Sequence, residues 1–158
     1  MTKECKQQFT LRITQANSTQ MVVILYEMLL CYLDEAKNAL EIQDKAAFTE
    51  AARKSRGCID ELMRSLRLEY EPAPVLLQLY LYCIRKLAAA ELHKQAGAIE
   101  EIVQVIKPLH DAYMQIADLN QAGPVMNNSQ SVYAGLTYGK NTLTENMADQ
   151  GANRGMLV

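Results

Sequence analysis

Residues 21–33 read MVVILYEMLLCYL, and this stretch decides the fold class. Only Glu27 interrupts the run of apolar and aromatic side chains, and the run is too short to span a bilayer, which takes about 20 apolar residues. Its most regular apolar positions, Met21, Leu25, Met28 and Tyr32, recur at spacings of three and four residues. This period is typical of one face of an α-helix, so the stretch predicts a helix with a large apolar surface.

A helical wheel divides the apolar side chains of this helix into two stripes. The first stripe is predicted to face the core and contains Met21, Leu25, Met28, Tyr32, Ala36 and Ala39. The second stripe lies about 100° further round the helix and contains Val22, Tyr26, Leu29, Leu33 and Leu40. A helix at the surface of a globular protein needs one apolar stripe, so the second stripe predicts an additional contact for this helix.

Short breakers divide the sequence into four predicted helices, at about residues 18–43, 45–70, 74–95 and 98–121. Asn17 is predicted to begin the first helix in a capping box with Gln20, Asp44 to cap the second, and Gly97 to end the third. Amphipathic helices with short connections favour an all-α fold, here an antiparallel up-down four-helix bundle.

The predicted bundle occupies residues 17–123, between an N-terminal arm at 1–16 and a long C-terminal tail at 124–158. The tail is rich in Asn, Gly, Ser and Thr, which is typical of a flexible segment. Within it, a capping-box pattern at Thr142 and Glu145 predicts a short helix at 142–150. Two interpretations of the tail stay open: the apolar run from Val132 to Tyr138 and this short helix dock on the bundle, or the tail is wholly flexible.

The predicted third helix also carries more apolar surface than a core contact requires. Beside a predicted core face of Leu76, Tyr80, Cys83 and Leu87, it presents further apolar side chains at Leu79, Leu81, Tyr82 and Ala88. Two interpretations of the excess stay open. The extra faces are buried by the arm, the tail or a homodimer contact, or they form a groove for an amphipathic helix of a partner. The residues predicted to line such a groove are Tyr26, Leu29, Leu33, Leu79 and Tyr82.

Composition limits the classes of function. The net charge of −2 gives no reason to expect nucleic acid as a partner or insertion into a membrane. The first twenty residues lack the apolar segment of a signal peptide, so a cytoplasmic location is expected. The four cysteines form no CxxC pair and are expected to act as small apolar side chains rather than metal ligands.

No motif predicts catalysis, a cofactor or a metal, so we expect a non-enzymatic protein. Neither His93 nor His110 belongs to the Glu-x-x-His pairs of di-iron bundles, and no phosphate-binding loop or nucleophile motif is present. One alternative is a histidine phosphotransfer domain that uses His93. Gly97 fits the motif of such domains, but Ala96 stands where they have a lysine.

Three blocks of residues resemble the FliS family of flagellin-specific export chaperones. They are Ile13 with ANSTQM at 16–21 and LYE at 25–27, then LYLYCIRKL at 79–87, then AIEEIV at 98–103 followed by Tyr113. The resemblance covers roughly residues 9–120. Ser18, Met28 and Leu81 depart from the proline, glycine and aspartate that are usual in the family, and the tail lies outside the resemblance.

This resemblance implies a cytoplasmic chaperone that binds the disordered C-terminal segment of flagellin. Such chaperones keep flagellin from polymerising early and assist its type III export, in which the flagellar export gate is a further expected partner. The family's N-terminal arm can cover part of its own groove. An adaptor for another secreted or flagellar client is the alternative within the same class. The excess apolar surface agrees with this role, because a segment that folds on binding needs a large apolar interface.

Overall fold

The structure is a computed structural model that describes residues 3–126. These residues form five α-helices and no strand, which confirms the predicted all-α class for this part of the chain. The helices are α1 (Lys3–Gln15), α2 (Ser18–Glu41), α3 (Lys45–Arg64), α4 (Ala73–His93) and α5 (Ala96–Leu119). All five lie in one unit, Met1–Val125. The predicted helix at 142–150 and the docking run from Val132 to Tyr138 lie outside the described residues.

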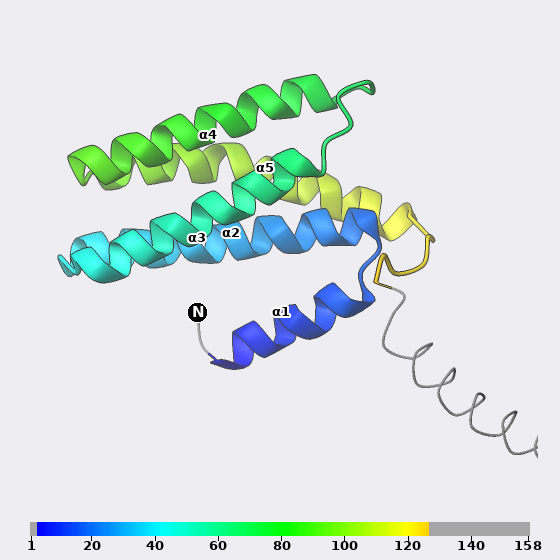
Figure 1. The fold of residues 1–158 in the computed structure, drawn as a ribbon, viewed down its shortest axis with the longest axis horizontal. Coiled ribbons are helices and arrows are strands. Elements are labelled where there is room, and N and C mark those ends of the chain that lie inside the picture. Colours follow the sequence, from blue (N-terminus) through cyan, green and yellow to red (C-terminus); the bar gives the residue numbers. More distant parts are fainter. Residues whose placement is uncertain (1–2, 127–158) are drawn as a thin grey trace, which may run out of the picture. The chain divides into compact units, whose positions relative to one another are not determined.

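The four longer helices contact one another in a ring. Helix α2 packs against α3 and α5, and α4 packs against the same two helices. Their shared core contains large side chains that are fully buried, including Phe48, Ile59, Leu87 and Ile102. Helix α1 packs on the outer side of α2 (Figure 1). The structure therefore has one main core inside the ring and a smaller contact between α1 and α2.

Two predicted helix starts are confirmed. The Asn17 side chain accepts a hydrogen bond from the Gln20 amide, and the Gln20 side chain accepts one from the Asn17 amide, which completes the capping box. Asp44 caps α3 by accepting a hydrogen bond from the Ala47 amide at 2.9 Å. Both caps depend on residues within one turn, which is why the sequence predicts them well.

Two predicted helix ends are wrong. Helix α3 ends at Arg64 rather than near Tyr70, because the chain turns there through hydrogen bonds such as that from the Leu66 amide to the Met63 carbonyl. Helix α4 ends at His93, where Lys94 adopts a left-handed conformation (φ 54°) and its amide bonds to the Ala90 carbonyl. A non-glycine residue thus closes α4, and the predicted terminator Gly97 lies inside the first turn of α5.

The N-terminal arm contains a helix that the sequence did not predict. Helix α1 is mostly polar. Apart from the exposed Leu11, its apolar positions Cys5, Phe9 and Ile13 form a single narrow row that continues to Ala16 just after the helix. Spacings of four, four and three residues in that row match one helical face, and this is the signal that could have revealed α1. No helix among residues 3–126 is long and apolar enough to cross a membrane.

Candidate partner-binding site under helix α1

Helix α2 buries apolar side chains on two sides. One side faces the ring of helices and contains Tyr26, Leu29 and Leu33, each 0% exposed. The other side faces α1 and contains Ile24, which is 2% exposed, with the partly buried Met21, Met28 and Cys31 around it. Both stripes of the helical wheel therefore contribute to the main core, and α1 covers a further side of α2 around Ile24.

A small apolar cluster holds α1 against α2. Its buried members are Phe9, Ala16 and Ile24, and partly buried side chains surround them at Cys5, Ile13, Met21, Met28 and Cys31. Phe9 anchors α1 and is 8% exposed, whereas Leu11 on the outer face of the same helix is 61% exposed. The cluster is much smaller than the main core, so α1 is held by far less buried apolar area than the other helices.

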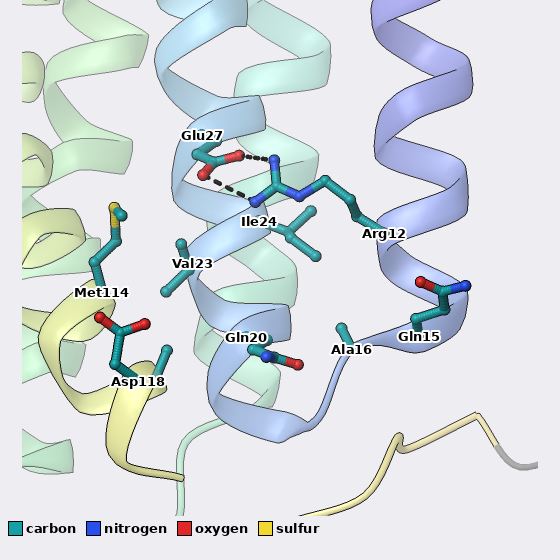
Figure 2. Close-up of a pocket in the computed structure, with 10 residues that line it drawn as sticks. Arg12, Gln15, Ala16, Gln20, Val23, Ile24, Glu27, Met114 and Asp118 are labelled. Atoms are coloured by element: carbon teal, nitrogen blue, oxygen red, sulfur yellow. Dashed lines mark hydrogen bonds and ion pairs between the residues drawn. The ribbon is translucent and has the colours of Figure 1, made fainter. Parts of the chain in front are cut away.

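A cavity of about 350 Å³ opens beside this cluster, between α1, α2 and the end of α5 (Figure 2). Val23 and Ile24 of α2 and Ala16 at the α1–α2 junction form part of its apolar wall. Met114 adds an apolar side chain from α5, while Glu27 is one of the charged groups that line the cavity. The contact between α1 and α2 is thus incompletely filled.

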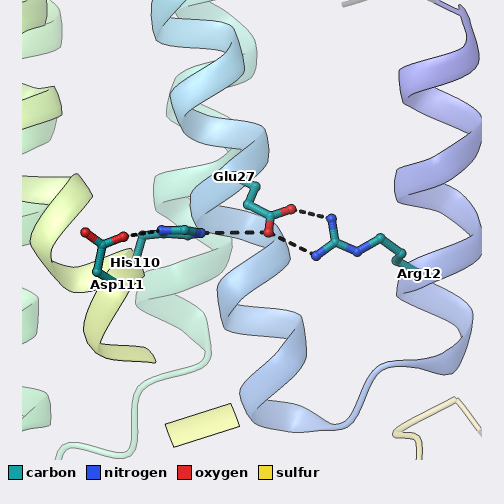
Figure 3. A network of polar contacts seen from close by, with 4 residues as sticks. All are labelled: Arg12, Glu27, His110 and Asp111. Carbon is teal, nitrogen blue, oxygen red and sulfur yellow. Dashed lines mark hydrogen bonds and ion pairs between the residues drawn. The ribbon is translucent and has the colours of Figure 1, made fainter. Parts of the chain in front are cut away.

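A polar network joins α1, α2 and α5 at the edge of the cluster (Figure 3). The Arg12 guanidinium donates two hydrogen bonds to the Glu27 carboxylate, one of them at 3.0 Å, and this pairing raises the pKa of Arg12. The ring of His110 lies between two carboxylates, with Nδ1 2.9 Å from Asp111 Oδ1 and Nε2 3.7 Å from Glu27 Oε1. Glu27, the single charge of the opening stretch, therefore serves as the polar attachment of α1.

The predicted groove residues on α2 need a correction. Tyr26, Leu29 and Leu33 do not line a surface groove, because all three side chains are buried in the main core. The stripe predicted to face the core is confirmed for Tyr32, Ala36 and Ala39, so both stripes of the wheel belong to the main core. The half-buried Met21 packs on the α1 cluster, whereas Met28 packs against both that cluster and the main core. The side of α2 that meets α1 is centred on Ile24, which belongs to neither stripe of the wheel.

The predicted groove residues on α4 lie apart from the α1–α2 contact. Leu79 and Tyr82 are half-buried. The Tyr82 hydroxyl donates a hydrogen bond of 2.7 Å to Glu101 of α5, and Lys86 forms an ion pair of 2.5 Å with the same carboxylate. The structure does not bring these two residues to the α1-facing side of α2.

The two histidines have different surroundings. His93 is exposed and is the last residue of α4, while His110 belongs to the network around Glu27. Within residues 3–126, no group of three or more His, Cys, Asp or Glu side chains is placed to hold a metal ion.

The fold and this site define a small helical protein in which an apolar helix face is covered by a loosely held helix of the same chain. Residues 1–122 match the family model described as Flagellar protein FliS, and the chain belongs to the FliS family. It is also 33% identical over 108 residues to the flagellar secretion chaperone FliS of Salmonella typhimurium strain LT2, a match that covers 66% of this chain and 80% of the relative. The family match includes all five helices.

Proposed function

We propose that the chain is a cytoplasmic flagellar export chaperone that binds the C-terminal segment of flagellin. The observation that carries this proposal is the docking of α1 on an apolar face of α2 through a cluster with only three buried side chains, Phe9, Ala16 and Ile24. Membership of the FliS family supports the class of function. The name of the Salmonella relative, a flagellar secretion chaperone, supports the role in export.

The α1-facing side of α2 has the properties of a site for an amphipathic helix. It already accepts one helix of 13 residues, α1, through Met21, Ile24 and Met28. Two of these side chains are methionines, whose flexible thioethers adapt to differently shaped partners. We therefore propose that a helix of the client replaces α1, with its own apolar positions packed on the same row of α2.

The scaffold for this exchange is proposed to be an antiparallel up-down bundle of α2 to α5. The ring of contacts among these four helices supports it, because their core does not depend on α1. A scaffold that stays folded when α1 leaves can hold the client and keep its apolar faces from polymerising. It can then present the client to the flagellar export gate.

Competition by α1 gives the proposal a quantitative test. If α1 and the client share one site, the client binds only those molecules in which α1 is undocked. Its apparent affinity for the protein is then lower in proportion to that undocked fraction. Phe9→Ala removes the anchor of α1 without changing α2, so it should tighten client binding about tenfold for each 1.4 kcal/mol of docking that is lost. Leu11→Ala is the matched control, because Leu11 lies on the exposed face of the same helix.

The measurement is calorimetric titration of the full chain and both variants with the C-terminal ~50 residues of the cognate flagellin, a length that allows wrapping. We expect binding by the wild type, tighter binding by Phe9→Ala, and no change for Leu11→Ala. Absence of binding at micromolar concentrations would contradict the chaperone proposal. Binding that Phe9→Ala leaves unchanged would instead place the client away from α1.

A further inference from the structure

The junction between α1 and α2 is tied to the segment that follows α5. Residues 120–125 return to this junction, although they are more than a hundred positions away in the sequence. The Val125 amide donates a hydrogen bond of 2.9 Å to the Ala16 carbonyl. The Asn120 side chain donates one of 2.7 Å to the Thr19 hydroxyl in the first turn of α2. The segment that follows α5 is therefore hydrogen-bonded to the α1–α2 junction, about which α1 would rotate if it left α2.

Asn17 is the centre of this attachment. Its side-chain oxygen accepts the capping hydrogen bond from the Gln20 amide, and its side-chain nitrogen donates to the carbonyls of Asn120 at 3.2 Å and Ala122 at 3.3 Å. The residue is only 3% exposed, so these groups cannot be satisfied by bulk water. Aspartate and serine also cap helices, but aspartate has no side-chain donor and serine has one, whereas the amide of asparagine has two.

The position of these hydrogen bonds relates a movement of α1 to a movement of residues 120–125. Ala16 and Asn17 link the last residue of α1 to the first residue of α2, so a rotation of α1 away from α2 turns the peptide groups of the link. The Ala16 carbonyl that accepts from Val125 belongs to that link, and so does the Asn17 side chain. The same link therefore joins α1 to α2 and holds residues 120–125.

We propose that Asn17 is a positioning residue that latches residues 120–125 to the α1–α2 junction and couples their release to the release of α1. The coupling is a property of the free protein. Together with the proposed function, which it extends, it means that a client displacing α1 also releases residues 120–125. Free and loaded chaperone then present different surfaces at this end of the helices, which a later partner in export can distinguish.

The test is amide hydrogen exchange, measured by NMR on the full chain. Asn17→Asp keeps the capping oxygen and removes both donors to residues 120–125. We expect the Val125 amide and the α1 amides of Phe9 and Ile13 to exchange faster by a similar factor, about tenfold, since each lost hydrogen bond contributes about 0.5–1.5 kcal/mol. Amides in the middle of α3 should keep their protection.

Asp44→Asn is the matched control. It replaces aspartate by asparagine at the N-cap of α3, the reverse of Asn17→Asp, and keeps a capping oxygen there. It should change neither Val125 nor α1. Thr19→Val is a second variant in case Asn17→Asp folds poorly. It removes only the acceptor for Asn120, so we expect a smaller acceleration that is again shared by Val125 and α1.

An acceleration at Val125 without one at Phe9 and Ile13, or no acceleration at either place, would overturn the coupling. A separate arm adds the flagellin segment to the wild type. If the segment does not bind, the proposed function fails while the exchange results on the free protein still decide the latch. If it binds and exposes the α1 amides but leaves Val125 protected, the latch is wrong and the chaperone function stands.

Discussion

The hydroxyl groups of Tyr26 on α2 and Tyr80 on α4 are hydrogen-bonded to each other inside the main core. Tyr26 is 0% exposed and Tyr80 is 1% exposed, and the ring of Tyr113 packs edge-on against Tyr26 with centroids 5.6 Å apart. The pair is a polar contact between two helices on opposite sides of the ring. It also explains why Tyr26, a predicted groove residue, belongs to the core.

Removing one hydroxyl of this pair should cost more than removing both. Tyr26→Phe leaves the Tyr80 hydroxyl buried without its partner, and an orphaned buried polar group costs about 1–3 kcal/mol of unfolding free energy. The double variant Tyr26→Phe/Tyr80→Phe has no orphan, so it should be at least as stable as the single variant. Urea unfolding of wild type, both single variants and the double variant measures this coupling. Additive costs would show that the two hydroxyls do not interact.

Alkaline pH should destabilise the protein. Burial raises the pKa of Tyr80 to about 12 from its ordinary 10.0, and raises the pKa values of Cys58 and Cys83 to about 11 from 9.0. The unfolded chain then loses these protons at lower pH than the folded protein does. The stability linked to these groups is complete below about pH 9 and is lost as the pH rises toward 12.

The measurement is the free energy of unfolding at a series of pH values above 8, a range chosen to span the ordinary pKa of thiols. Cys58→Ala lowers the stability by a constant amount through lost packing, but it should flatten part of the decline because one titrating thiol is gone. A free energy of unfolding that stays constant up to about pH 11.5 would contradict the assigned burial of these groups.

Truncation of Leu33 should reveal a core residue rather than a surface one. Leu33→Ala should lower the free energy of unfolding by about 2–5 kcal/mol, because the side chain is fully buried and leaves a cavity. Leu79→Ala removes a side chain of the same size at a half-buried position of α4 and should cost less than half as much. Urea unfolding followed by far-UV circular dichroism compares the two. If Leu33→Ala instead kept full stability and lost client affinity, its role as a groove residue would be restored.

The hydroxyl of Ser55 offers a stabilising change. Its oxygen is buried and has no hydrogen-bond partner among the described residues, and the residue faces the core from α3. Ser55→Ala removes the unpaired group with little change of volume, so it should raise the free energy of unfolding by about 1 kcal/mol. Ser65→Ala is the control, because the Ser65 hydroxyl donates a hydrogen bond of 2.7 Å to the Leu62 carbonyl. Thermal unfolding should move in opposite directions for the two variants.

Local sequence signals predicted most of the fold in the described residues. The starts of α2 and α3 follow from Asn17 and Asp44, whose caps act within one turn. The predicted core face of α4 is also confirmed, since Leu76, Tyr80, Cys83 and Leu87 are buried. Helix ends were less predictable, because a left-handed residue such as Lys94 can take the place of glycine when the surrounding structure holds it.

The candidate site is predicted less well from the sequence than the fold is. The excess apolar surface of α2 was a correct signal that this helix has contacts on more than one side. The hydrogen bonds from Asn17 to Asn120 and Ala122 left no pattern in the sequence, because they join segments more than a hundred residues apart. The α1 helix could have been found from the row of Cys5, Phe9 and Ile13.

The sequence by itself determined that this is a helical protein, where its main helices begin, and that residues 21–33 carry two apolar stripes. Only the tertiary structure decided that Tyr26, Leu29 and Leu33 face the main core while Met21 and Ile24 face α1. The physical reason is that hydrophobic burial has no direction of its own. Every apolar side of an isolated helix is an equally good core face, so the helices that pack around α2 decide which sides enter the main core and which side meets α1.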